Sequence, residues 1–239
     1  MKKDPLKIRK ESKTVFLTSS PYTEDGERFI DNDFLTELRK VWVKTNVLNI
    51  ASFPDSYEIS DEYSKRHERL FREAGFEIDK WIDLDHRNHA KTAELIKSCG
   101  VVILNGGHCM TEMNFFNEIN LKNLLNDFEG IIIGVSAGSM NAAATVYAPE
   151  EYEEELEDPN FKKYYQGLGL TDVNIFPHYQ MYKNQYLRDK RMMEDIVYKD
   201  SVGHKFLLIP DGSYLLIKDG KTEIHGEHYF LKDGVMHLI

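Results

Sequence analysis

Short apolar segments alternate with longer segments of helical period over the first 135 residues, and this alternation restricts the chain to few folds. The expected strands are Thr14–Thr18, Val47–Ala51, Ile78–Asp83, Val101–Leu104 and Ile131–Val135. Short runs that are apolar almost throughout are typical of parallel strands with both faces buried. The sequence therefore predicts an α/β fold: a doubly wound, mostly parallel sheet with helices on both faces.

The segments between these strands place apolar residues at helical spacing. The expected crossover helices are Arg28–Lys44, Ser60–Ala74, Lys91–Ser98 and Met113–Asp127. After the acidic loop Glu150–Asp158 the pattern changes. We expect a helix at Gln185–Tyr198 and closely spaced strands over Lys205–Ile239. Glycines punctuate these last strands, which predicts antiparallel strands at the C-terminal end of the sheet.

The chain has 239 residues and no Pro-, Gly- or Ser-rich linker. We predict a polar N-terminal tail over residues 1–13 and a single α/β hydrolytic domain over residues 14–239. The tail is basic and lacks the apolar stretch of a secretory signal. The two cysteines of the chain, Cys99 and Cys109, form no disulfide framework and lack the spacing of metal ligands. A cytoplasmic protein without a metal is expected.

Charge and hydropathy exclude two classes of partner. The formal net charge is -10, with no long basic run that could neutralise the phosphates of a nucleic acid. The apolar runs are far shorter than the roughly 20 residues of a membrane span. We therefore expect neither a nucleic acid nor a membrane as partner. The oligomeric state, for which a homodimer is one option, stays open.

The pentapeptide Gly134-Val135-Ser136-Ala137-Gly138 follows an apolar strand and precedes a run of small residues. This is the context of a nucleophile elbow, in which a strained serine stands between a strand and a helix. Ser136 is the candidate nucleophile. The N–H of Ala137 is the first candidate donor to an oxyanion. The alternative interpretation is a tight turn whose glycines serve packing only.

A second glycine turn, Asn105-Gly106-Gly107-His108, follows the preceding predicted strand. Both turns leave the carboxyl ends of parallel strands, where open α/β sheets hold their ligands. Gly106 or Gly107 could therefore supply a second oxyanion donor. The alternative is a helix-entry turn without a ligand.

A serine hydroxyl needs a base, and the base needs an orienting acid. Among nine histidines, His178 stands out because it follows a strand-like run that stops at Pro177. Asp211 has a similar setting after Pro210. Either residue could instead belong to an ordinary loop or turn.

Together, these segments resemble the peptidase E family of serine peptidases, also called aspartyl dipeptidases, which share the class I glutamine amidotransferase-like fold. The resemblance extends from the first strand to about Tyr214. It implies a catalytic triad of Ser136, His178 and Asp211. It also implies that the N–H groups of Gly107 and Ala137 form the oxyanion hole, and that no cofactor is needed.

The resemblance implies a small peptide as substrate, preferably with an N-terminal aspartate. The basic segment Arg188-Asp189-Lys190-Arg191 resembles the one thought to hold the acidic side chain of the substrate, so Arg188 is a candidate substrate-binding residue. Two departures stand out. Asp211 occupies a position that is glutamate in several members, and His108-Cys109 replaces an Asn-Thr pair. The roles of His108 and of the acidic loop stay open.

Two other functions remain as alternatives. An α/β-hydrolase-type esterase would use Ser136, then Asp211, then His228 or His237 in chain order. A non-catalytic binding protein could keep the same fold without the chemistry.

Overall fold

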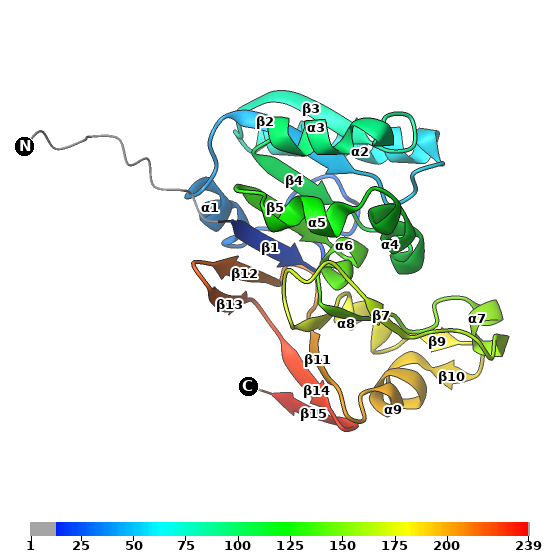
Figure 1. The fold of residues 1–239 in the computed structure, drawn as a ribbon. Helices are drawn as coiled ribbons and strands as arrows, with labels where there is room; N and C mark the ends of the chain where they lie inside the picture. The colour runs from blue at the N-terminus through cyan, green and yellow to red at the C-terminus, as the bar shows by residue number, and fades with distance from the viewer. Residues whose placement is uncertain (1–12, 239) are drawn as a thin grey trace, which may run out of the picture.

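The computed structural model describes residues 13–238. The predicted N-terminal tail therefore lies outside the described residues, apart from Lys13. Figure 1 shows a large twisted sheet and a smaller sheet beside it. The large sheet has seven strands in the order β13-β12-β1-β5-β4-β2-β3. Its strands are β1 (Thr14–Thr18), β2 (Thr45–Ile50), β3 (Ile78–Leu84), β4 (Val101–Leu104), β5 (Ile131–Val135), β12 (Tyr214–Lys218) and β13 (Lys221–His225).

The strands β1 to β5 pair in parallel, and β12 and β13 add antiparallel at one edge. All five predicted parallel strands are present, with ends that differ by at most two residues. The predicted α/β class with antiparallel strands near the C-terminus is confirmed.

Helices cover both faces of the large sheet. On one side are α1 (Phe34–Arg39) and α2 (Tyr57–Glu73), and on the other are α3 (Thr92–Ser98), α4 (Cys109–Glu118) and α5 (Leu121–Asn126). Strand β4 shows why its sequence is apolar throughout. Val101 and Ile103 pack in the core cluster with α1 and α2, whereas Val102 and Leu104 pack with α3, α4 and α5.

The predicted helix Arg28–Lys44 is much too long, because only Phe34–Arg39 is helical. The preceding residues form a turn in which the Arg28 carbonyl accepts a hydrogen bond from Thr23 N–H and Gly26 has a φ of 70°. The Phe29 ring packs 5.2 Å from the Phe71 ring. Phe29 is thus a loop residue that packs in the core, and its position in the sequence fits a helical period although the backbone there is not helical.

The predicted helix Met113–Asp127 is in fact two helices, α4 and α5. Asn120 has a φ of 53°, a left-handed conformation that ends one helix and redirects the chain into the next. Both helices bury apolar residues in the same core cluster, so their combined pattern resembled one helix.

The predicted helix Gln185–Tyr198 is also wrong over its first half. Strands β9 (Tyr186–Leu187) and β10 (Lys190–Arg191) form a small hairpin, followed by the π-helical segment η2 (Met192–Val197) and α9 (Tyr198–Asp200). The apolar residues that gave the helical pattern lie mainly in η2, where Met192 and Val197 are fully buried.

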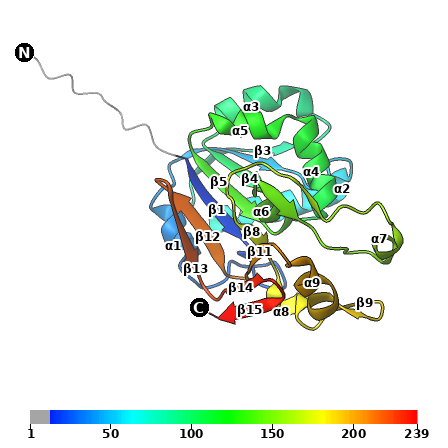
Figure 2. The same cartoon turned by 60° about the horizontal axis from the view of Figure 1, so that its bottom comes forward.

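The C-terminal strands do not all join the large sheet. A second sheet of four strands has the order β15-β14-β11-β8. Its strands are β8 (Asn174–Phe176), β11 (Lys205–Leu208), β14 (Tyr229–Lys232) and β15 (Val235–Leu238). Strands β8 and β11 are parallel neighbours, and β8 lies next to α6 (Ala137–Asn141) (Figure 2). The sheets therefore meet at the end of β5.

The remaining elements are short. They are η1 (His89–Lys91), β6 (Thr145–Tyr147), α7 (Glu153–Glu157), β7 (Tyr164–Gln166) and α8 (Tyr179–Tyr182). Within residues 13–238, none of the helices has the length and apolar character of a membrane span.

Candidate active site

Ser136 stands at the sharp turn between β5 and α6, with φ 51° and ψ −114°. Its N–H donates to the carbonyls of Thr18 and Ser19, which fixes this unfavourable conformation. Little space surrounds the turn. A Cβ on Gly138 would lie 2.3 Å from the Leu104 carbonyl oxygen, and a Cβ on Gly106 would lie 2.9 Å from the Ser136 Cβ. The two glycines are therefore steric requirements of the turn.

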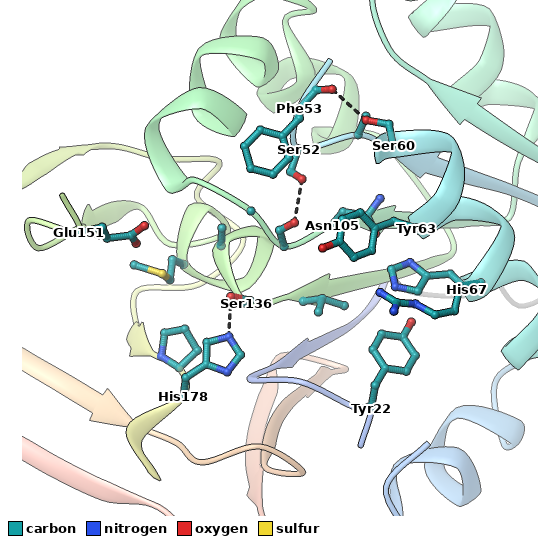
Figure 3. A pocket seen from close by; sticks show the side chains of 18 of the residues that line it. Tyr22, Ser52, Phe53, Ser60, Tyr63, His67, Asn105, Ser136, Glu151 and His178 are labelled. Atoms are coloured by element: carbon teal, nitrogen blue, oxygen red, sulfur yellow. Dashed lines mark hydrogen bonds between the residues drawn. The ribbon is translucent and has the colours of Figure 1, made fainter. Parts of the chain in front are cut away.

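His178 reaches Ser136 from the second sheet (Figure 3). Its Nε2 lies 2.8 Å from Ser136 Oγ. Strand β8 ends at Phe176, and His178 itself is left-handed, with a φ of 55°. Its N–H donates to Ser19 Oγ at 2.8 Å. The main chain of His178 is thus tied to the end of β1, the strand beside β5.

Asp211 completes the arrangement, with its Oδ1 2.7 Å from His178 Nδ1. The parallel pairing of Phe176 with Leu208 explains this proximity, because both strands end at the same edge. Ser19 Oγ donates to Asp211 Oδ1 at 2.6 Å, and Gln180 Nε2 donates to Oδ2 at 2.7 Å. The carboxylate therefore accepts three hydrogen bonds, which prefer its ionised form.

Burial of Asp211 opposes its ionisation, but the hydrogen bond to His178 and the attraction of that residue outweigh it. Together with the bonds from Ser19 and Gln180, they hold the pKa of Asp211 below its ordinary value. Sequence reasoning missed Ser19 and Gln180. Ser19 had a detectable signal, since it directly follows β1 at the edge of the sheet that carries Ser136.

Gly107 and Ala137 both line a cavity beside Ser136. Within residues 13–238 neither N–H has a hydrogen-bond acceptor. A Cβ on Gly107 would lie 2.5 Å from Ser52 Oγ, so only glycine fits there without displacement. Both predicted oxyanion donors thus border the same space as the Ser136 hydroxyl.

The cavity has a volume of about 450 Å³, within the range of small-ligand sites. Figure 3 shows Glu151 on one side of Ser136 and Tyr22, Tyr63 and His67 on the other. Burial raises the pKa of Glu151, although neighbouring His108 partly opposes this shift. Burial, assisted by the charge of Arg66, lowers the pKa of His67 to about 4.

The model of the peptidase S51 family matches residues 15–225 of the sequence. The chain belongs to peptidase family S51. The predicted relationship to peptidase E is confirmed, and the protein is a peptidase. No curated protein matches this S51 peptidase significantly.

Solved structures share the fold of this S51 peptidase. A peptidase from an acI-B1 Actinobacterium is 16% identical with a TM-score of 0.64, over 95% of this chain and 94% of its own. A protein of Listeria monocytogenes EGD-e, described as a peptidase E, is 15% identical with a TM-score of 0.57, over 89% of this chain and 98% of its own.

Arg188, the predicted substrate-binding residue of this S51 peptidase, does not line the cavity. Arg188 lies in the turn of the β9–β10 hairpin, with a φ of 56°. Its guanidinium pairs with Glu153 at 2.9 Å and with Glu157, both in α7. Of the lysines and arginines among residues 13–238, Arg66 of α2 is the one that lines the cavity. Sequence reasoning missed it because the charged face of α2 resembles an ordinary solvated helix.

The structure of this S51 peptidase places His108 outside the cavity and the acidic loop at its border. His108 bonds Thr111 Oγ1 at 2.8 Å and lies 3.4 Å from Glu155, and it does not line the cavity. The acidic loop does reach the cavity, through Glu151. Neither His228 nor His237 lines the cavity, so the Ser-Asp-His order of an α/β-hydrolase esterase is not assembled.

Proposed function

We propose that the protein is a serine peptidase that cleaves short peptides, with Ser136 as nucleophile. The observation that carries the proposal is the continuous chain from Ser136 Oγ through the His178 ring to Asp211, with distances of 2.8 Å and 2.7 Å. A serine hydroxyl within hydrogen-bond reach of an imidazole that is itself bonded to a half-buried carboxylate is the arrangement that nucleophilic catalysis requires.

In the proposed reaction, Ser136 Oγ attacks the peptide carbonyl while His178 Nε2 takes its proton. Asp211 accepts a hydrogen bond from the Nδ1–H, which keeps Nε2 free to act as the base. The N–H groups of Gly107 and Ala137 stabilise the oxyanion. His178 then protonates the leaving amine, and water hydrolyses the acyl-enzyme in a second cycle of the same groups.

The substrate class follows from the size of the cavity and from the resemblance to aspartyl dipeptidases. A cavity of about 450 Å³ suits a short peptide. A preference for N-terminal aspartate needs a cation at the cavity, and Arg188 is paired elsewhere. Within residues 13–238, Arg66 is the arginine that lines the cavity, and the dipeptide panel below determines whether the enzyme prefers N-terminal aspartate.

A dipeptide panel tests this function. Aspartyl, glutamyl and neutral dipeptides are incubated with the wild type and with Ser136→Ala, and the released amino acids are quantified. We expect hydrolysis by the wild type and loss of at least a thousandfold in kcat for the variant. Hydrolysis that survives Ser136→Ala would contradict the assignment.

A pair of histidine variants separates this function from the esterase alternative. His178→Ala should abolish hydrolysis, whereas His237→Ala should leave it unchanged. The opposite result would favour an esterase with the Ser-Asp-His order.

A further inference from the structure

Two side chains of opposite charge line the cavity beside Ser136, and neither forms a salt bridge within residues 13–238. Glu151 lies in the loop between β6 and α7, and Arg66 lies on α2. Charged groups that face a cavity unpaired are costly to keep there unless something binds them. Other charged residues of the same loop and helix do form salt bridges.

The carboxylate of Glu151 makes no hydrogen bond or ion pair with any of residues 13–238. Only the main-chain N–H of Glu151 is engaged, by donation to Glu155 Oε2 at 2.7 Å. Glu153 and Glu157 of the following helix, in contrast, both pair with Arg188. Within the acidic loop, Glu151 is thus the carboxylate that points to the cavity, as Figure 3 shows.

The guanidinium of Arg66 also lacks a carboxylate partner within the described part of the chain. It lies over the Tyr63 ring, with Cζ 4.9 Å from the centroid. The next two arginines of α2 are both paired, Arg69 with Glu27 and Glu73, and Arg72 with Glu68. Arg66 is half-buried and keeps its hydrogen-bond donors available.

The two charges lie on opposite sides of the serine hydroxyl. In Figure 3, Glu151 lies on one side of Ser136 and Tyr63 lies on the other, and the Arg66 guanidinium lies over the Tyr63 ring. A short peptide carries its α-ammonium on the acyl side of the scissile bond and its terminal carboxylate on the other side. The charge pattern of the cavity is complementary to that of such a substrate.

We propose that Glu151 binds the free α-ammonium group of a short peptide and that Arg66 binds a carboxylate of the same peptide. This inference rests on the proposed function, because it defines how that site selects its substrate. The carboxylate has two sources of the same chemistry on that side of the scissile bond, the C-terminus or an acidic side chain of the second residue. The two contacts together fix the scissile carbonyl at Ser136 and select peptides of short length.

Binding to Ser136→Ala tests the inference without any chemistry. Calorimetry measures the affinity for Ala-Ala, N-acetyl-Ala-Ala, Ala-Ala-amide and Ala-Asp-amide. Each is tested with Ser136→Ala alone and with Glu151→Gln, Arg66→Gln or Arg66→Lys added. Arg188→Gln is the matched control, because it removes a paired arginine outside the cavity. Circular dichroism verifies that each variant is folded.

We expect Glu151→Gln to weaken Ala-Ala about tenfold or more and to leave N-acetyl-Ala-Ala unchanged. Arg66→Gln should weaken Ala-Ala similarly and leave Ala-Ala-amide unchanged if the C-terminus is the partner. A loss confined to Ala-Asp-amide would identify the acidic side chain of the second residue instead. Arg66→Lys should retain part of the affinity, and Arg188→Gln all of it.

Equal losses for blocked and unblocked peptides, or no peptide binding at all, would overturn the inference. Hydrolysis by the wild type tests the proposed peptidase function independently of these binding measurements. A protein that binds peptides in a charge-dependent way but never cleaves them would refute the peptidase mechanism alone. Hydrolysis without any dependence on the two charges would refute the present inference alone.

Discussion

At the scale of residues, the candidate triad could be predicted because each member has a local signal. Ser136 stands between two glycines, and His178 and Asp211 each follow a proline at the end of an apolar run. The pairing of Arg188 away from the cavity could not be predicted, because it depends on a tertiary contact. Arg188 is neutralised by Glu153 and Glu157, which are about 30 residues away in the chain.

Asp211 carries the first prediction at this scale. Asp211→Asn keeps the shape of the side chain but can no longer hold the His178 tautomer that accepts a proton at Nε2. We expect kcat to fall by about three to four orders of magnitude, with a much smaller change in KM. Steady-state kinetics on the best dipeptide of the panel measures both. A loss of less than tenfold would show that Asp211 does not orient the histidine.

His67 carries a prediction about stability. Burial lowers the pKa of His67 to about 4 in the folded protein, against an ordinary value near 6.5. The folded state therefore binds fewer protons than the unfolded state between these two values. Stability should fall by about 2 to 3 kcal/mol as the pH drops from 6.5 to 4.

The test of this prediction compares the wild type with His67→Phe, which keeps a ring stacked on Tyr22 but cannot be protonated. Urea unfolding is measured between pH 7 and pH 4. The stability of the wild type should decline more steeply than that of the variant. If the unfolding free energy of the two proteins depends on pH in the same way, His67 is not buried as a neutral imidazole.

At the scale of elements, β1, β4 and β5 were predictable because both of their faces are buried and their sequences are short and apolar. The helices were less predictable. Phe29 packs in the core from a loop, and Asn120 divides one apolar pattern between two helices. Periodicity reports which residues are buried, but it does not report where the backbone bends.

The turn between β5 and α6 leads to a prediction for this element. Ser136 has a positive φ with a ψ of −114°, a conformation that glycine adopts without a steric cost. Ser136→Gly should therefore be more stable than Ser136→Ala by about 1 to 3 kcal/mol. Thermal and urea unfolding measure the difference.

The matched control for this turn is Lys65, an exposed residue in the middle of α2. There, glycine should be less stable than alanine by about 0.5 to 1 kcal/mol, because it weakens a helix. The same sign at both positions would mean that the conformation of Ser136 stores no strain.

At the scale of the whole molecule, the candidate site is assembled where the two sheets meet. The large sheet provides Ser136 after β5 and Ser19 after β1, and the second sheet provides His178 after β8 and Asp211 after β11. The second sheet was not predictable, because its strands alone resemble further edge strands of the first. The single domain over residues 14–239 stays a prediction.

A single domain should unfold as one cooperative unit. Trp42 and Trp81 both pack in the core cluster of the large sheet, whereas far-UV circular dichroism reports all elements. The two signals should give one coincident transition. Leu231→Ala, in the core of the second sheet, should lower the stability by about 2 to 5 kcal/mol in both signals. A shift seen in circular dichroism alone would show that the sheets unfold independently.

The most direct test of the central claim is labelling of the protein with a fluorophosphonate, followed by mass spectrometry of the intact chain and its peptides. Such a probe reacts with a serine only when that serine is activated by a base. The account predicts one adduct, on Ser136, that is lost in His178→Ala and retained in His237→Ala. Absence of an adduct on Ser136 in the folded wild type would contradict the claim that His178 activates this serine.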